Sequence, residues 1–245
     1  MPPRQRALRR TLPVPARKTE GLQTGRSHTM SALSILDTPV PGTVGRTAYA
    51  DLTATLIQTR QQLAPKRLFA PGPDARQIHA YFQAAAAAPD HGQILPWRFV
   101  VVPAASRAAL GEVFAQALRE RDASASDKEL AEARDKAHRG PFVALAIVRD
   151  ATDDHPEIPL QERLISLGCA IQNLLLSAHA DGFGSGLVSG QAMQTARLRR
   201  LFAMAHNEQA VCFVAIGTAD RRKPIRPRPD PALFVSELNC EADHV

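Results

Sequence analysis

The sequence has few of the features that mark secreted, membrane-spanning or metal-binding proteins. Only three of its 245 residues are cysteines, Cys169, Cys212 and Cys240, and none forms a Cys-x-x-Cys pair. This number and spacing favour neither a disulfide framework nor a zinc site, and they predict a reducing, cytoplasmic location. No apolar run approaches the roughly 18 residues of a membrane span, and the first residues lack a secretory apolar stretch. We therefore expect no membrane partner.

The net charge of +6 lies at one end of the chain. Seven basic residues and one acid fall within residues 1–29, and the charges of the rest balance. A neutral globular part does not predict nucleic-acid binding. Residues 1–45 are rich in Arg, Pro, Ser and Thr without a hydrophobic period, which is typical of disorder. Translation starting at Met30 explains this extension better than an organellar targeting peptide or a nucleic-acid tail. We expect one domain over 46–245.

Hydrophobic periodicity predicts helices and strands without a regular βαβ alternation. Helices are expected at 48–62, 74–88, 106–121, 126–139, 158–181 and 191–204. Strands are expected at 99–102, 142–148 and 210–217, after the glycines at 182–186, and as an edge strand at 232–238. Asp74 is a candidate N-cap, and Ser126 with Glu129 forms a candidate capping box. This order favours an α+β domain.

Three familiar kinds of active site are not supported by the sequence. The glycines at 182–186 follow a predicted helix and precede a strand, the reverse of a dinucleotide-binding fingerprint, so a helix C-cap explains them better. His79 and His91 lie on different elements and lack the spacing of metal ligands, which argues against a metal site. Ser185 lacks the Gly-x-Ser-x-Gly spacing of a nucleophile elbow. No catalytic residue is therefore assigned.

The most informative segment is 84–97, with the sequence AAAAAPDHGQILPW. An alanine-rich helix lets a flat molecule approach its backbone, and a loop between Pro89 and Pro96 that carries His91 is stiff. Trp97 begins a hydrophobic strand. These features predict a ligand-binding loop. Basic residues at Arg60, at 66–67 and at 221–228 are either solvated or converge on one phosphate group.

Together these segments resemble the FMN-dependent nitroreductase family, in particular its short single-domain branch of NAD(P)H nitroreductases. The resemblance covers roughly 55–240. The matching segments are APDHG at 88–92, LPWRFVV at 95–101, LGCAIQNLL at 167–175, DGFG at 181–184 and IGTA at 216–219. The Pro-Asp-His and Pro-Trp motifs at this spacing are the more specific; the Gly-Phe-Gly and Ile-Gly-Thr segments are weaker alone.

The resemblance implies an α+β fold with a mainly antiparallel central sheet flanked by helices, in an intertwined homodimer with C-terminal strand exchange at 232–238. It implies FMN at the dimer interface, NAD(P)H as electron donor, a small-molecule electron acceptor and ping-pong kinetics. Arg60 to Gln62 would meet the ribityl phosphate, and residues 187–189 would come from the opposing subunit. The residues implied to bind the cofactor are Arg60, Gln61, Gln62, Lys66, Arg67, His91, Gln93, Leu95, Leu187, Val188, Ser189 and Arg222.

The sequence departs from the family pattern at two places. Arg60 is followed by two glutamines where the family has Arg or His and then Ser, so either Arg60 or the pair Lys66–Arg67 would hold the phosphate. Leu95 stands before Pro-Trp where relatives carry glutamine, and Gln93 would be the substitute. The alternatives to a nitroreductase are another flavin reaction on this scaffold, such as a dehydrogenase or dehalogenase, and a protein that only sequesters FMN.

Overall fold

The computed structural model describes residues 47–150, 155–221, 224 and 227–238. The expected extension at 1–45 and the predicted cofactor-binding residue Arg222 lie outside the described residues.

The centre of the domain is an antiparallel sheet of five strands in the described part of the chain. The strands run in the order β1-β5-β3-β2, and β4 also pairs with β5. Their bounds are Leu68–Phe69 (β1), Trp97–Val101 (β2), Phe142–Arg149 (β3), Gly184–Val188 (β4) and Glu208–Ala219 (β5). All these strand pairs are antiparallel. The expected α+β class with a mainly antiparallel sheet is therefore confirmed.

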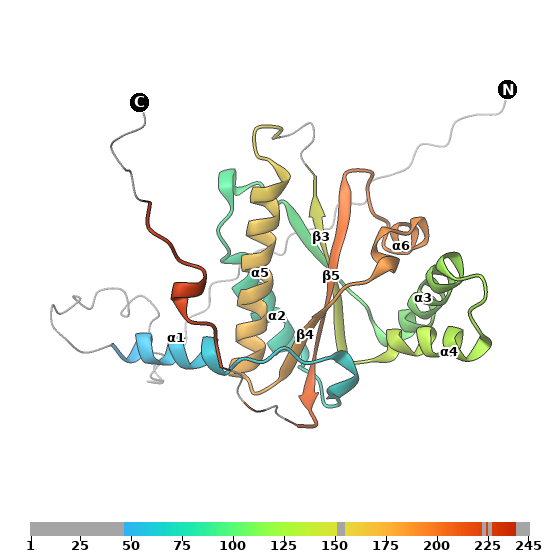
Figure 1. Ribbon diagram of the computed structural model, residues 1–245, viewed down its shortest axis with the longest axis horizontal. Coiled ribbons are helices and arrows are strands. Elements are labelled where there is room, and N and C mark those ends of the chain that lie inside the picture. Colours follow the sequence, from blue (N-terminus) through green and yellow to red (C-terminus); the bar gives the residue numbers. More distant parts are fainter. Residues whose placement is uncertain (1–46, 151–154, 222–223, 225–226, 239–245) are drawn as a thin grey trace, which may run out of the picture. The chain divides into compact units, whose positions relative to one another are not determined.

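Helices cover both faces of this sheet (Figure 1). They are Ala48–Thr59 (α1), Ala75–Ala86 (α2), Arg107–Arg121 (α3), Asp127–Asp135 (α4), Leu160–Ala180 (α5) and Ala196–Leu201 (α6). Two of them begin at the predicted caps. Asp74 accepts from the backbone of Gln77 before α2, and Ser126 forms a complete capping box with Glu129 before α4. Such side-chain caps satisfy backbone N–H groups that have no partner inside the helix.

The alternation of side chains along β3 divides the core into two parts. Ala144, Ala146 and Val148 pack with α2 and α5, in a cluster that contains Tyr81 and Leu174. The intervening residues of β3 face α3 and α6 and belong to a second cluster, which includes Leu110, Phe213 and Phe202. Because successive side chains of a strand point to opposite faces, a strand covered on both faces is apolar throughout.

Two predicted elements differ from the structure. The expected helix at 191–204 is broken at Thr195, whose backbone is extended and whose Oγ1 accepts from Leu198 N at 3.2 Å. A threonine that caps a helix N-terminus competes with the continuation of the preceding turn. The expected edge strand at 232–238 is also absent from the described chain, since a short 3₁₀ turn over Pro231–Leu233 follows the Asp230 cap. The residues after it are exposed and unpaired with the sheet.

None of the helices in the described ranges combines the length and apolar character needed to cross a membrane.

Candidate functional site

The loop Asp90–Leu95, called here the His91 loop, has an unusual backbone. Gly92, Gln93 and Leu95 all have positive φ angles, of 70°, 53° and 44°. Glycine adopts this conformation readily, whereas for Gln93 and Leu95 it is uncommon. Residues held in this way occur where the surrounding structure imposes the conformation, and they concentrate at functional sites.

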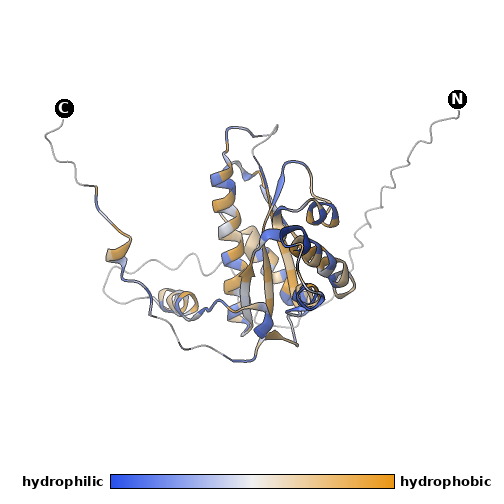
Figure 2. Cartoon of the chain, turned by 45° about the vertical axis from the view of Figure 1, so that its right-hand side comes forward, coloured by the Kyte–Doolittle hydropathy of each residue, from blue (hydrophilic) through white to orange (hydrophobic). Residues whose placement is uncertain are grey.

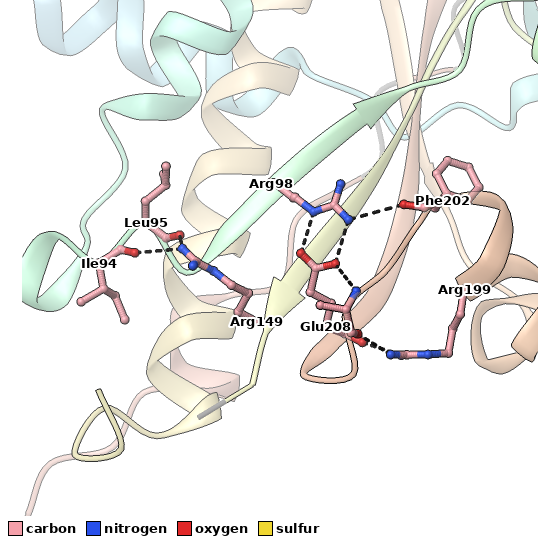
Figure 3. Close-up of polar contacts among 8 residues, drawn as sticks. Ile94, Leu95, Arg98, Arg149, Arg199, Phe202 and Glu208 are labelled. Carbon is pink, nitrogen blue, oxygen red and sulfur yellow. Dashed lines mark hydrogen bonds and ion pairs between the residues drawn. The ribbon is translucent and has the colours of Figure 1, made fainter. Parts of the chain in front are cut away.

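Two side chains, those of Asp90 in the loop and of Arg149 in β3, hold the His91 loop in this conformation. Asp90 Oδ2 accepts from the backbone N of Leu95 at 2.8 Å. Arg149, at the end of β3, donates to the carbonyl oxygens of Ile94, at 3.1 Å, and of Leu95. Figure 3 shows the Arg149 guanidinium directed at these two carbonyls. The loop is therefore preorganised by contacts within one chain.

The His91 loop presents two side chains outward. Leu95 is 52% exposed. The imidazole of His91 is also largely exposed, and its Nδ1 lies 2.6 Å from Glu162 Oε2 in the first turn of α5. Trp97 points the other way, because its buried Nε1 donates to Ser166 Oγ at 2.9 Å. Trp97 thus anchors the loop, while His91 and Leu95 are available for contact.

The chain after α1 is attached to strand β4. Gln62 Nε2 donates to Leu187 O at 2.8 Å, and Leu63 N donates to Ser185 O at 2.9 Å. A Cβ at Gly186 would lie 1.9 Å from Leu63 O, so this close approach requires glycine. Gln62 and Leu187 are therefore neighbours within a single chain, whereas the resemblance implied that 187–189 come from the opposing subunit.

A small hollow of about 30 Å³ lies at the start of β4 and contains polar groups without partners. Arg60, Gln61 and Ser185 are among its lining residues. Arg60 Nε and Nη1 and Ser185 Oγ are buried and have no hydrogen-bond partner in the described chain. Buried polar groups are normally satisfied, so such a cluster indicates a place where water, an ion or a ligand binds. The hollow itself holds only a group of about the size of water.

A second guanidinium lies beside this hollow. Arg228 Nη2 donates to the carbonyl oxygens of Gln58, at 3.0 Å, and of Arg60, at 3.1 Å. Burial, and then the charge of Arg228, lower the pKa of the Arg60 guanidinium from its ordinary value. Both effects disfavour the charged form of Arg60. A bound anion would favour that form and so offset them. We call this hollow the arginine hollow. Arg60 and Ser185 line it, and Arg228 lies beside it.

Lys66 lies in a different and larger space. A cavity of about 510 Å³ is lined by Lys66, Val188 and Ser189, together with residues of α3 and of the chain that follows α4. Arg67 lines neither this cavity nor the arginine hollow, and its carbonyl accepts from Asp220 N at 3.4 Å. The two alternatives for the phosphate, Arg60 and the Lys66–Arg67 pair, therefore occupy separate places.

The predicted site residues form two groups in one chain. Val188 pairs with Phe213, in a row that continues through Leu145 to Val100 on β2. Three strand spacings separate β4 from β2, or about 14 Å. The His91 loop precedes β2, so His91, Gln93 and Leu95 lie beyond one edge of the sheet, whereas residues 187–189 lie at the opposite edge. Within one chain, the two groups of predicted site residues therefore do not form a single site.

Several residues at these places were not singled out from the sequence. Glu162 and Arg149 act on the His91 loop, and neither stands near it in the sequence. Arg228, by contrast, belongs to the basic residues at 221–228 that the sequence singled out as a possible phosphate contact, but the sequence did not show that it is the one beside Arg60. Within the described ranges, no group of three or more His, Cys, Asp or Glu side chains is arranged to hold a metal ion.

Comparisons with known proteins match this chain to one family. The nitroreductase family model matches residues 70–218. A "Putative NAD(P)H nitroreductase" of Haemophilus influenzae is 34% identical over 164 residues, which are 67% of this chain and 86% of that protein. Escherichia coli K12 "Putative NAD(P)H nitroreductase YdjA" is 29% identical over 187 residues, 76% of this chain and 98% of that protein.

Solved structures show the same fold at low sequence identity. A nitroreductase-like family protein of Bacillus cereus superposes with a TM-score of 0.63 at 16% identity, covering 76% of this chain and 95% of that one. The FMN-dependent nitroreductase NfnB of Mycobacterium smegmatis, solved with NADPH, has a TM-score of 0.60 at 18% identity, covering 78% of this chain and all of that one. At these identities the likeness concerns the fold alone.

Proposed function

Because the chain belongs to the nitroreductase family, whose members are flavin-dependent oxidoreductases, we propose that it passes electrons from NAD(P)H through FMN to a small acceptor. The acceptor is a nitro compound, a quinone or a similar molecule, and the kinetics are ping-pong, with donor and acceptor using one site in turn. Bound FMN would supply the chemistry of hydride acceptance and two-electron transfer between donor and acceptor. Reduction of a nitro group to a nitroso group consumes one NAD(P)H and one proton and releases water.

The observation that carries this proposal is the arginine hollow. Its buried, unpartnered Arg60 nitrogens and Ser185 Oγ, with the guanidinium of Arg228 beside them, suit a phosphate at the opening of the hollow. Ser185 and Val188 are three residues apart on β4, or about 10 Å. A ribityl chain bridges such a distance, which would bring the flavin ring to Val188, Ser189 and Lys66. Of the two alternatives for the phosphate, these contacts favour Arg60.

We further propose that two copies of the chain complete the site as a homodimer. The His91 loop and residues 187–189 lie at opposite edges of one sheet. The His91 loop of a second chain would therefore complete the site. Helix α1 has no buried residue, and its Tyr49, Leu52 and Ile57 are each at least 50% exposed. Figure 2 shows hydrophobic colouring on α1 and on the turn near the C-terminus. Exposed apolar surface of this kind marks interaction sites.

In this proposal the protein binds and orients, and it needs no acid–base pair of its own. The arginine hollow holds the anionic end of the cofactor, and the His91 loop limits the access of water to the ring. The Arg149 and Asp90 contacts keep His91 and Leu95 in position before any ligand arrives. A site organised in advance loses little free energy to reorganisation when it binds.

One spectroscopic experiment separates this proposal from its alternatives. Purified protein supplied with FMN should become yellow, lose its visible absorbance with NADPH or NADH in the absence of oxygen, and regain it with a quinone or nitroaromatic compound. Failure to retain FMN would refute every flavin function. Retention of FMN without reduction by NAD(P)H would favour a sequestering protein, and reduction without reoxidation by these acceptors would favour a different flavin reaction.

A further inference from the structure

The cavity beside Val188 and Ser189 has an apolar floor. It is lined by Leu110 and Phe114 of α3, Val143 of β3, Phe213 of β5 and Met193. Its volume of about 510 Å³ falls within the range of small-molecule sites, which are typically 300–1,000 Å³. Aliphatic and aromatic walls favour a flat, apolar part of a ligand, because burying it removes apolar surface from water.

Four cationic side chains surround this floor. Lys66 belongs to the 3₁₀ turn at 65–67, Arg121 ends α3, and Lys136 and Arg139 follow α4. Three of the four residues are exposed and Arg139 is half-buried, so the charges lie at the rim and not on the floor. We call this set the cationic rim.

No carboxylate neutralises the cationic rim from within the cavity, since none of its lining residues is acidic. Two glutamates of α3 are paired with arginines that do not line the cavity. Glu112 binds Arg134 at 2.6 Å, and Glu120 binds Arg197 at 3.1 Å. The Nη1 of Arg121 donates to the uncharged Gln191 Oε1 at 3.0 Å. The carboxylate of the neighbouring Asp122 also interacts with the charge of Arg121, but Asp122 does not line the cavity. The cavity therefore combines an apolar interior with a positively charged entrance.

The phosphate of the cofactor does not account for the cationic rim. In the proposed function that phosphate lies at the arginine hollow, near Ser185, and the rim lies around the other end of β4. Of the four rim cations, only Lys66 would meet the uncharged flavin ring, so Arg121, Lys136 and Arg139 have no role in holding the cofactor. We infer that the physiological acceptor is a flat, apolar molecule carrying a carboxylate or another anionic group. This inference rests on the proposed flavin function and narrows its substrate class. The donor NAD(P)H also combines anionic phosphates with a flat ring. The experiments below therefore distinguish an anionic acceptor from the donor.

The first experiment compares two acceptors of nearly equal shape. Reduced, FMN-loaded protein is reoxidised by 4-nitrobenzoate or by 4-nitrobenzamide, each of which takes up two electrons and two protons and releases water on forming the nitroso product. We expect kcat/KM to favour the carboxylate by about tenfold at low salt, and the ratio to fall as salt screens the rim. Equal values for the two acceptors, in a protein that NAD(P)H does reduce, would overturn the inference but leave the proposed function intact.

The second experiment alters the rim. In the double variant Arg121→Gln/Lys136→Gln, the preference for nitrobenzoate over nitrobenzamide should fall about threefold. This variant removes two of the four rim charges, and each exposed charge contributes a factor of roughly 1.8 to the preference, which is in the range of exposed ion pairs. The double variant Arg76→Gln/Lys128→Gln is the matched control. It removes the same charge from exposed residues that do not line the cavity, and it should keep the preference.

Two further measurements distinguish an anionic acceptor from the donor as the ligand of the cationic rim. Benzoate, which is not reduced, should bind the oxidised, FMN-loaded protein more tightly than benzamide in calorimetry, and the rim variant should reduce this difference in affinity. The rate of flavin reduction by NADPH relative to NADH should not change in the rim variant. If that donor ratio changes and the acceptor ratio does not, the rim binds the phosphate of the donor and the inference is wrong. A protein that binds no FMN would instead refute the proposed function.

Discussion

The arginines at the two ends of the sheet differ in whether the protein itself supplies their hydrogen-bond partners. Near the His91 loop, Arg149 donates to two carbonyls, and Arg98 forms a two-pronged contact with Glu208 at 2.6 and 2.7 Å (Figure 3). In the arginine hollow, two nitrogens of Arg60 are buried without a partner in the described chain. The first end is satisfied by the protein itself. The second is satisfied only if something binds, which is why we assign the ligand's anion to it.

Two side chains in the His91 loop are exceptions at this otherwise satisfied end of the sheet. Asp90 Oδ1 is buried without a partner, while Oδ2 of the same carboxylate holds Leu95 N. The imidazole of His91 meets Glu162 but is largely exposed. The arginines of this end therefore support a loop whose outward side chains have no partner in the described chain apart from Glu162. The comparison predicts that substitutions at the hollow reduce ligand binding, and that substitutions at the other end mainly reduce stability.

The largest effect is expected for Arg60→Ala. Removing this guanidinium should weaken FMN binding about 100-fold, or about 2.7 kcal/mol, because a charge-assisted contact to phosphate is lost. The folded protein should be no less stable, since the variant also removes a buried charge without a partner. Flavin fluorescence titration and thermal unfolding measure the two quantities. FMN affinity equal to that of the unmodified chain would show Arg60 to be structural.

A stability effect of about 2 kcal/mol is expected for Arg149→Met, which leaves the carbonyls of Ile94 and Leu95 without their charged donor. Chemical denaturation measures this loss. Arg199→Met is the matched control, because Arg199 also donates to two carbonyls, those of Ala205 and Glu208. Both variants should be destabilised, but only Arg149→Met should also weaken FMN binding. A loss of FMN affinity in both would mean that general destabilisation is the cause.

A smaller, pH-dependent effect concerns Glu208. The hydrogen bond from Arg98 holds the pKa of this carboxylate below its ordinary value, although burial opposes the shift. The unfolded chain therefore binds more protons in this range, and folding stability falls as pH drops from about 5 through the folded pKa. Glu208→Gln should flatten this part of the stability curve, at a cost of about 1–2 kcal/mol at neutral pH. Urea unfolding at several pH values measures it, and parallel curves would contradict the assignment.

The smallest effect is expected for His91→Ala. The exposed imidazole adds little to folding, so stability should change by less than about 0.5 kcal/mol. FMN binding should weaken about fivefold if His91 lines the flavin of a neighbouring chain. Glu162→Gln is the companion variant, because it keeps a hydrogen-bonding group beside His91 and should produce a smaller loss. An FMN affinity unaffected by His91→Ala would remove this residue from the site.

Local sequence signals predicted the elements well where the determining contacts are short-range. Ser126 and Glu129 satisfy one another's backbone groups within a single turn, and the predicted capping box is confirmed. The glycine run was correctly interpreted as a helix end followed by a strand, with Gly182 at a φ of 86°. The break at Thr195 was not predicted, because a capping threonine and a helical threonine look alike in a sequence until the neighbouring turns are known.

Contacts between distant residues were beyond such reasoning. Arg60 and Arg228 are 168 residues apart, and Glu162 lies 71 residues from His91. Composition marked both basic segments, but not which arginine of the tail meets Arg60. The cations of the rim come from three separate elements, and only Lys66 was expected at the site.

The sequence by itself determined most of the elements, the caps at Asp74 and Ser126, the buried strand β3 and, through the Pro-Asp-His and Pro-Trp motifs, the family. These features depend on backbone preferences and on side chains a few residues apart. Only the tertiary structure decided which charges are satisfied. The antiparallel pairing of β4 with β5 brings Ser185 against the chain after α1 and puts the His91 loop beyond the opposite side of the sheet. Whether a guanidinium has a partner depends on that pairing, because burial and hydrogen bonding are properties of the assembled fold.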